Sequence, residues 1–289
     1  TSSILALPVA LFLCAAPAVF LPSCAVDPIT GRSSLHLLPD DQVDQMGAQA
    51  FQQILQESEG AVLPPESPEA QLVRRVGARI AAVVDQQLIE SGREPFDWEF
   101  VVIESDQVNA FALPGGKVAF YTGILPVAAN ETGIAVVMGH EVAHAYGRHA
   151  NSRLSMNVIA KYGLGAVQHA LSGGGDSMVN QLTLAALGVG TQVGMLGFSR
   201  EDEAHADELG LIFMARAGYD PREAIAFWER MEAAAGGSGG LPEFLSTHPG
   251  PESRIRNLNE TLPRALDEYR KAASATGGNA AVSRSGGAK

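Results

Sequence analysis

Residues 134–149 read IAVVMGHEVAHAYGRH and contain the pattern His140-Glu141-Val142-Ala143-His144. On a helix, His140 and His144 are four residues apart and share a face, so both imidazoles can reach one metal ion. Glu141 lies beside the pair and can act as general base toward a water at that ion. The apolar residues before the pattern, with Asn130 as N-cap, favour a helix. The pattern alone indicates a zinc peptidase helix, although a helix carrying two surface histidines has the same spacing.

A catalytic zinc ion usually has three protein ligands, so the third ligand decides the class of site. One known continuation places a histidine six residues after His144, but that position is Ala150, and His149 falls one residue short. The other solution is a glutamate on a later helix. The stretch SREDEAHAD, residues 199–207, supplies Glu203 for this role.

This second stretch also has the signals of a helix start. Ser199 is a plausible N-cap with Asp202 at the capping-box position. Glu203 and Asp207 are four residues apart, so Glu203 can bind the metal while Asp207 accepts the second ring N–H of a zinc-bound histidine, which we expect to be His140. The alternative is a solvated acidic helix start, because acidic side chains favour that end in any helix.

Composition excludes several classes of protein. The chain has 289 residues with 20 basic and 32 acidic side chains, a net charge of −12. Nucleic-acid binding is not expected, because it needs a basic surface. Hydrophobic residues make up 46 %, enough to bury a core. Cys14 and Cys24 are the two cysteines, which excludes a disulfide framework and a cysteine-ligated zinc site in the main body.

The N-terminus has the features of an export signal. Residues 4–21 are uncharged and mostly apolar, and Leu21-Pro22-Ser23-Cys24 resembles the lipobox of bacterial lipoproteins. We therefore expect residues 1–23 to be a signal peptide and Cys24 to carry lipid that anchors the protein in a membrane. Ala25 after the cysteine favours the outer membrane as a sorting signal. The alternative is a free Cys24 at the end of an uncleaved signal anchor.

The rest of the chain divides into a tether, one domain and a tail. Residues 24–38 are predicted to be a tether, residues 39–273 the folded domain, and residues 274–289 a disordered tail of small residues. Within the domain we expect helices over 39–58 and 67–91, short strands over 97–104, 109–113 and 117–121, and mostly helix from 130 onward. Residues 179–196 are apolar but contain polar side chains, which favours a buried or interfacial helix over a membrane span.

Four segments together resemble a known family. They are CAVDPITGRSSLHLL at 24–38, NAFALPGG at 109–116, GHEVAHAYGRH at 139–149, and SREDEAHAD with the later THPGPESRI. In this order they are similar to the membrane-associated gluzincin zinc metallopeptidases, the family of the CAAX prenyl protease, HtpX, the mitochondrial overlapping-activity protease and the BepA-like periplasmic proteins. The tether is most similar to that of the lipoprotein members.

The resemblance implies roles for further residues. Asn109, Ala110 and Phe111 match an edge strand that holds substrate by strand addition, although an inner strand is the other interpretation of this short apolar run. His248 matches a downstream histidine that either stabilises the oxyanion or occupies the fourth zinc position in a latent state. Arg254 matches an arginine with a charge-stabilising or structural role. For the remaining histidines we expect structural or surface roles: His36, His149, His169 and His205.

These observations predict a mostly helical α+β zincin domain with a small sheet or hairpin and one zinc ion per chain. Zinc is expected on His140, His144 and Glu203, with water or His248 in the fourth position. The expected activity is that of a zinc endopeptidase of the bacterial cell envelope, lipid-anchored and facing the periplasm, acting on misfolded or misassembled envelope proteins. Two alternatives remain: a chaperone or assembly factor for outer-membrane proteins with a latent zinc site, and an integral membrane protease using residues 179–196.

Overall fold

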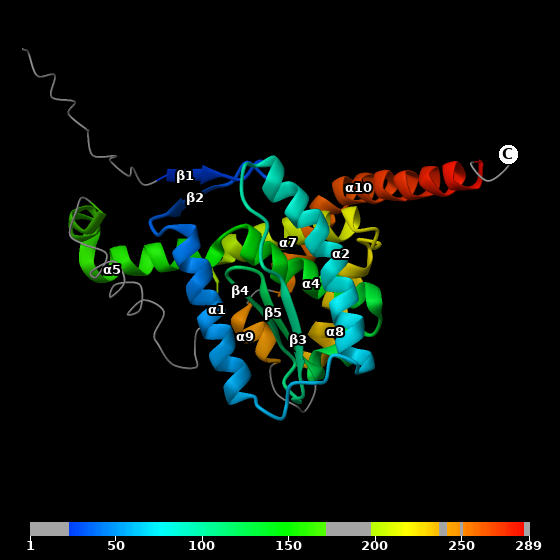
Figure 1. Ribbon diagram of the computed structural model, residues 1–289, viewed down its shortest axis with the longest axis horizontal. Coiled ribbons are helices and arrows are strands. Elements are labelled where there is room, and N and C mark those ends of the chain that lie inside the picture. Colours follow the sequence, from blue (N-terminus) through cyan, green and yellow to red (C-terminus); the bar gives the residue numbers. More distant parts are fainter. Residues whose placement is uncertain (1–22, 172–197, 237–241, 249–250, 286–289) are drawn as a thin grey trace, which may run out of the picture.

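A computed structural model of the chain describes residues 23–171, 198–236, 242–248 and 251–285 (Figure 1). Its centre is a three-stranded sheet of β3 (Glu99–Ile103), β4 (Ala110–Leu113) and β5 (Lys117–Tyr121) in the order β3-β5-β4. β5 is parallel to β3 and antiparallel to β4. The turn between β4 and β5 contains Gly115 and Gly116, whose φ angles of 77° and 84° favour glycine. β4 therefore stands at an edge of this sheet.

Helices cover both faces of the sheet because its side chains alternate between two apolar clusters. On one face, Phe111 and Leu113 pack with Phe51 of α1 (Asp40–Glu57). On the other face, Ala110 and Phe120 belong to the main core, which also contains α2 (Pro68–Glu90) and α4 (Glu131–Tyr146). The sheet thus lies between α1 and the pair formed by α2 and α4.

The most central helix is α4, in which every residue from Gly133 to Tyr146 is buried. A helix that is apolar nearly all round has to be enclosed by others. α4 contacts the sheet, α2 and α7 (Arg200–Arg216). The remaining elements are η1 (Thr122–Ile124), α3 (Leu125–Ala128), α5 (His149–Leu171), α8 (Glu223–Ala235), α9 (Glu243–Thr247) and α10 (Pro251–Ser285).

The segment assigned to a tether forms a small antiparallel hairpin of β1 (Ser23–Val26) and β2 (Ser33–His36). The last residue of β2, His36, and the two that follow it, Leu37 and Leu38, are buried. The connection between the two strands contacts α7 and α10 through side-chain hydrogen bonds. This segment is therefore a folded part of the domain surface as well as a link to the N-terminus.

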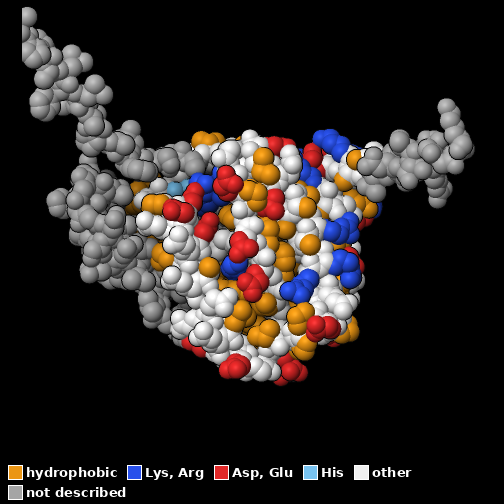
Figure 2. Space-filling view, in the orientation of Figure 1, with side chains coloured by type: hydrophobic (Ala, Val, Ile, Leu, Met, Phe, Trp, Pro, Cys, Tyr) orange, Lys and Arg blue, Asp and Glu red, His pale blue; other side chains and the backbone are white. Residues whose placement is uncertain are grey.

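The expected class, a mostly helical α+β domain with a small sheet, is confirmed. The predicted strands and the helices over 39–58 and 67–91 match the observed elements within two residues at each end. α10 continues to Ser285, beyond residue 273 where we expected the ordered domain to end. In the space-filling view, both acidic and basic side chains are present on the face shown (Figure 2).

Within the described residues, no helix combines the length and the apolar character that a membrane crossing requires. The segment 179–196, on which the integral membrane hypothesis depends, lies outside the described residues, and so does the predicted signal up to residue 22.

Candidate active site

Helix α4 carries the first three residues of the site. Its start is fixed by Asn130, whose side-chain oxygen accepts a hydrogen bond of 2.9 Å from the Gly133 N–H. Ten residues later, His140, Glu141 and His144 occupy the last two turns and are 4 %, 1 % and 2 % exposed. Such low exposure excludes the interpretation of this pattern as a helix with two surface histidines.

Helix α7 supplies the acidic residues. Ser199 and Asp202 form a capping box, as predicted, which starts α7 immediately before Glu203. α7 crosses α4 very closely because two glycines face each other: a Cβ on Gly210 would lie 2.8 Å from the Gly139 carbonyl carbon. Since no side chain separates the two backbones, the carboxylates of α7 reach the histidines of α4.

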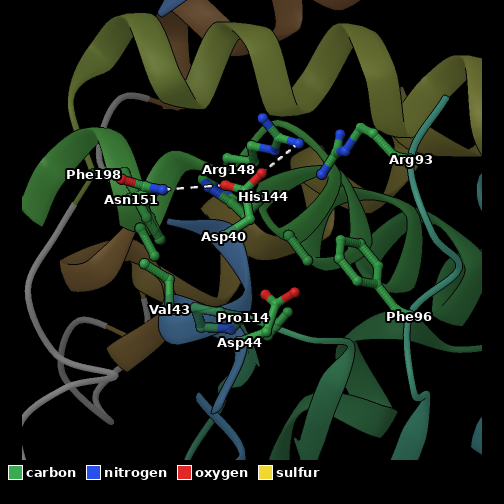
Figure 3. A pocket seen from close by; sticks show the side chains of 13 residues that line it. Asp40, Val43, Asp44, Arg93, Phe96, Pro114, His144, Arg148, Asn151 and Phe198 are labelled. Carbon is green, nitrogen blue, oxygen red and sulfur yellow. Dashed lines mark hydrogen bonds and ion pairs between the residues drawn. The ribbon is translucent and has the colours of Figure 1, made fainter. Parts of the chain in front are cut away.

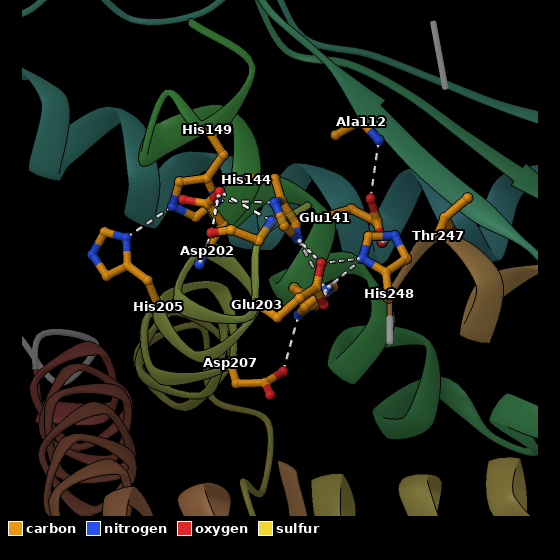
Figure 4. A network of polar contacts seen from close by, with 12 residues as sticks. Ala112, Glu141, His144, His149, Asp202, Glu203, His205, Asp207, Thr247 and His248 are labelled. Atoms are coloured by element: carbon orange, nitrogen blue, oxygen red, sulfur yellow. Dashed lines mark hydrogen bonds and ion pairs between the residues drawn. The ribbon is translucent and has the colours of Figure 1, made fainter. Parts of the chain in front are cut away.

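Four side chains converge on one point from α4, α7 and the end of α9 (Figure 4). His140 Nε2 lies 3.1 Å from His144 Nε2 and 3.2 Å from His248 Nδ1. Glu203 Oε1 lies 2.9 Å from His248 Nδ1 and 3.6 Å from His144 Nε2. In a tetrahedral zinc site with bonds of about 2.0–2.1 Å, ligand atoms are about 3.3 Å apart. The four donor atoms therefore fit a zinc ion in spacing and in chemistry.

The protonation states of the donors also suit a metal. Burial lowers the pKa of His144 well below its usual value, so this imidazole is neutral, as a metal ligand must be. Burial alone would raise the pKa of Glu203, but its neighbours His248 and Arg254 outweigh this and hold the pKa below its ordinary range. Glu203 is thus a carboxylate.

Arg254 and Asp207 surround His140. Asp207 Oδ1 lies 3.0 Å from His140 Nδ1, the contact proposed from the spacing in α7. The buried Arg254 donates to Glu203 Oε2 at 2.8 Å and makes two bonds to Asp207, at 2.6 and 2.9 Å. Burial would raise the pKa of Asp207, but Arg254 and His140 lower it on balance. Arg254 thus balances two buried carboxylates next to the metal position.

Glu141 lies beside the four donors and faces the sheet. Its Oε2 accepts a hydrogen bond of 3.0 Å from the Ala112 N–H of β4. Its Oε1 is buried without a hydrogen-bond partner, and His248 Nε2 is 3.5 Å away. Burial raises the pKa of Glu141 to about 7, although His248 opposes the rise. A carboxyl with a free oxygen and a pKa near neutrality is suited to proton transfer.

Of the residues expected in the edge strand, Phe111 lines a cleft next to Glu141. Ala110 and Phe111 are in β4, whereas Asn109 precedes the strand and its side chain accepts from the Ala110 N–H. Within the described residues, β4 pairs with β5 alone. The cleft encloses about 570 Å³ of space open to solvent. It is lined by Phe111, Ala112, Glu141, Phe198, His248 and residues of α1.

A second pocket of about 400 Å³ shares Ala112, Pro114 and Phe198 with this cleft and reaches His144 (Figure 3). Its wall contains a salt bridge between Asp40 and Arg148. The two spaces therefore adjoin at Ala112 of β4.

Sequence reasoning missed the surroundings of His149 and His205. His149 Nδ1 lies 2.9 Å from His144 Nδ1, and both His149 and His205 are buried. A helix would place His149 away from His144, but the chain turns at Arg148, which has a φ of 55°. A helix end at Gly147-Arg148 was the available signal. His36 is buried near β2, and the side chain of His169 lies outside those described.

The site has the features of a zinc metallopeptidase of the His-Glu-x-x-His type. These are two histidines four residues apart on a buried helix, a glutamate from a second helix, and a carboxyl group beside them. The sequence model of peptidase family M48 matches residues 73–262. The chain belongs to this family, and zinc as its cofactor and metalloendopeptidase as its enzyme class, both expected from the sequence, are confirmed at family level.

Individual relatives come from mitochondria and bacteria. The chain is 38 % identical over 240 residues to mitochondrial metalloendopeptidase OMA1 of Schizosaccharomyces pombe, which covers 82 % of this chain and 66 % of the relative. It is 33 % identical to the same protein of Saccharomyces cerevisiae, covering 87 % and 73 %. It is 30 % identical to the beta-barrel assembly-enhancing protease of Escherichia coli K12, covering 83 % and 47 %. The chain thus spans from about half to three quarters of these relatives.

Proposed function

We propose that this protein is a zinc endopeptidase of the bacterial cell envelope that hydrolyses peptide bonds in misfolded or misassembled envelope proteins. The observation that carries the peptidase chemistry is Glu141, whose free Oε1 and pKa of about 7 place a proton acceptor beside the donor cluster. The envelope setting is supported by the lipobox-like sequence at Cys24 and by the similarity to an Escherichia coli protease named for beta-barrel assembly.

Each residue of the site has a step in the proposed reaction. Zinc on His140, His144 and Glu203 would polarise the substrate carbonyl and the attacking water. Glu141 takes the proton of the attacking water and gives it to the leaving amine. The edge of β4 that faces away from β5 would align the substrate as an added strand, which takes over the N–H groups that Asn109 and Glu141 accept from in this structure.

The proposed chemistry is tested by Glu141→Gln in the full chain. The variant keeps the shape of the side chain and its acceptor for the Ala112 N–H, so we expect one bound zinc per chain by metal analysis. Casein cleavage is expected to fall by about 100-fold or more, the usual effect of removing a general base. Equal cleavage by both proteins would rule out Glu141 as the base, and absence of zinc from freshly purified protein would overturn the metal site.

The second candidate function is a chaperone or assembly factor for outer-membrane proteins with a latent zinc site. It is favoured by His248, whose Nδ1 stands among the other three donors rather than facing solvent. In this arrangement His248 fills the position that a water would need. In the alternative role, His248 moves aside and donates to the oxyanion.

The variant His248→Ala separates these roles. A gain of casein cleavage, with zinc retained, would mean that His248 blocks the site at rest. A loss of about a hundredfold to a thousandfold would mean that it stabilises the developing negative charge. The double variant with Glu141→Gln is the control, because any gained cleavage should vanish in it.

The membrane attachment rests on Cys24. We propose that this residue carries lipid, that the outer membrane holds the protein on its periplasmic side, and that envelope proteins that have failed to fold are its partners. Mass analysis of the mature N-terminus is expected to find an acylated Cys24, and Cys24→Ser should release the protein from membranes. An unmodified Cys24 with unchanged fractionation would contradict the anchor while leaving the peptidase untouched.

A further inference from the structure

A row of polar groups, buried at its three histidines, runs from the metal position to the N-terminal hairpin, and Figure 4 shows its part from His144 to His205. His144 Nδ1 is 2.9 Å from His149 Nδ1, and His149 Nε2 is 2.9 Å from His205 Nδ1. His205 Nε2 is in turn 2.9 Å from Thr30 Oγ1. The Thr30 hydroxyl donates to Asp27 Oδ1 at 3.0 Å. Thus three histidines from α4, α5 and α7 join a zinc ligand to a hydroxyl and a carboxylate of the hairpin.

The two ends of this row fix the direction of every hydrogen bond. His144 faces the metal with Nε2, so its Nδ1 carries the proton and donates to His149 Nδ1. His149 then has its proton on Nε2 and donates to His205 Nδ1 at 2.9 Å, a much shorter contact than the 3.5 Å from the same nitrogen to Arg32 Nη1, which can only donate. His205 likewise donates from Nε2 to Thr30, whose O–H donates to the Asp27 carboxylate. These tautomers are inferred from the bonding pattern, and each follows from the one before it.

The hairpin holds Thr30 and Asp27 firmly in place. Asp27 Oδ1 also accepts from the backbone N–H groups of Ile29 and Thr30, at 2.9 and 2.8 Å. Arg32 donates to Asp202 at 2.7 Å and to the Glu201 carbonyl at 3.0 Å, both at the start of α7. Arg264 of α10 donates to the Ile29 carbonyl at 2.7 Å. The loop is therefore built against the same helix that supplies Glu203.

We propose that Thr30 and Asp27 are positioning residues for the zinc ligand His144. The bond accepted by His149 keeps the His144 ring in the orientation and tautomer that zinc requires, and the hairpin holds His149 through His205. Removing the Thr30 hydroxyl leaves the His205 Nε2–H without this acceptor. The preference of His205, and through it of His149, for the Nε2–H tautomer then becomes weaker. This inference rests on the ligand role proposed for His144, and it is independent of the substrate.

The test compares Thr30→Val and Thr30→Ser in the full chain. Valine keeps the shape and removes the hydroxyl, whereas serine keeps the hydroxyl. Zinc affinity is measured by competition with a chromophoric chelator. Thr30→Val is expected to bind zinc about tenfold more weakly, the lower end of the effect of removing partners of metal-bound histidines. Thr30→Ser is expected to restore the affinity. Ser33→Ala, which removes an exposed hydroxyl outside the row, is the matched surface control.

Two further measurements distinguish a general loss of structure in Thr30→Val from a loss of the positioning of His144. The visible spectrum of the cobalt-substituted protein should change in Thr30→Val and return in Thr30→Ser, because it reports the ligand geometry directly. Nitrogen NMR of the zinc-loaded wild type should find His149 and His205 protonated at Nε2, a result that needs no variant to fold. Unchanged affinity and spectrum in Thr30→Val, or an Nδ1–H tautomer at either histidine, would overturn the inference. Failure of the wild type to bind zinc would instead overturn the proposed function.

Discussion

Burial of Glu141 links the stability of the zinc-free protein to pH. Because the folded-state pKa of about 7 lies above the ordinary glutamate value of 4.5, this group stabilises the fold fully below about pH 4.5, and the contribution is lost as pH rises through 7. We expect zinc-free Glu141→Gln to be more stable than zinc-free wild type at pH 8 by up to about 3 kcal/mol, and the two to converge near pH 4.5. Urea unfolding at both pH values measures the difference.

Bound zinc provides the control for this prediction. The positive ion favours the ionised carboxyl group, so the difference between Glu141→Gln and wild type should shrink when zinc is present. A difference that is the same at pH 4.5 and pH 8 would show that packing, rather than charge, sets the stability of this side chain.

Arg254 is the residue whose loss should be most damaging to the apo site. It is 2 % exposed and contacts Glu203, Asp207 and His140, so Arg254→Met leaves two carboxylates buried without their counter-charge. We expect a loss of about 3–5 kcal/mol in the free energy of unfolding. The matched control is Arg216→Met, because Arg216 pairs with Glu268 at a partly exposed position and should lose about 1 kcal/mol or less. Equal losses in the two variants would contradict this role.

The crossing of α4 and α7 depends on two glycines rather than on the ligands themselves. A methyl group on Gly210 would come within 2.9 Å of the Gly139 carbonyl oxygen, so Gly210→Ala has to push the two helices apart. Helix propensity favours alanine by about 1 kcal/mol, whereas overpacking costs about 1–3 kcal/mol, so we expect net destabilisation. Zinc affinity should also fall, because Glu203 moves away from His140 and His144.

Gly236→Ala is the control for this substitution. Gly236 caps α8 with a φ of −78°, and an added methyl group would meet its nearest neighbour at an ordinary 3.7 Å. Thermal unfolding and chelator competition on both variants test the idea. Unchanged stability and zinc affinity in Gly210→Ala would mean that the two helices adjust without moving the ligands.

Local sequence signals predicted the helices and strands well. They predicted the contacts between these elements poorly. The caps at Asn130 and Ser199 could be predicted because a capping side chain bonds within its own turn. The place of His149 depends on a single left-handed residue, Arg148, which periodicity does not reveal. The glycine pair 139 and 210 is separated by 71 positions, and nothing local marks either one as a crossing point.

At the level of the whole molecule, the order of the family's motifs made the set of metal ligands predictable. The strand order and the docking of the N-terminal hairpin, which surround those ligands, were not predictable. The four ligand candidates come from three segments that are far apart in the sequence: His140, His144, Glu203 and His248. Their proximity could be predicted only from the His-Glu-x-x-His motif and from the family resemblance. Strand order and hairpin docking involve long-range pairing, which residue patterns do not encode. For this reason the sequence predicts a tether over 24–38, although its residues Thr30 and Asp27 contact His205, which in turn bonds to His149.

Because the ligands lie on α4, α7 and the end of α9, zinc should stabilise the whole domain. Binding to the folded state alone adds about 4 kcal/mol when free zinc exceeds its dissociation constant a thousandfold. For a domain of this size that corresponds to a rise in Tm of roughly 8–16 °C. We therefore expect a chelator to lower the Tm by about this amount while the protein stays folded, since Arg254 still neutralises the buried carboxylates.

The variant Glu203→Gln is the control for the effect of zinc and chelator on the Tm. It removes a charged ligand and keeps the size of the side chain, so its Tm should hardly respond to zinc or to chelator. Calorimetry with parallel metal analysis distinguishes the outcomes. If wild type loses its zinc and keeps its Tm, the surrounding salt bridges alone hold the ligands in place. The metal then acts in the reaction and does not stabilise the packing of the helices. If the Tm falls in wild type and not in Glu203→Gln, the same ion that the reaction requires also joins the three segments that carry its ligands.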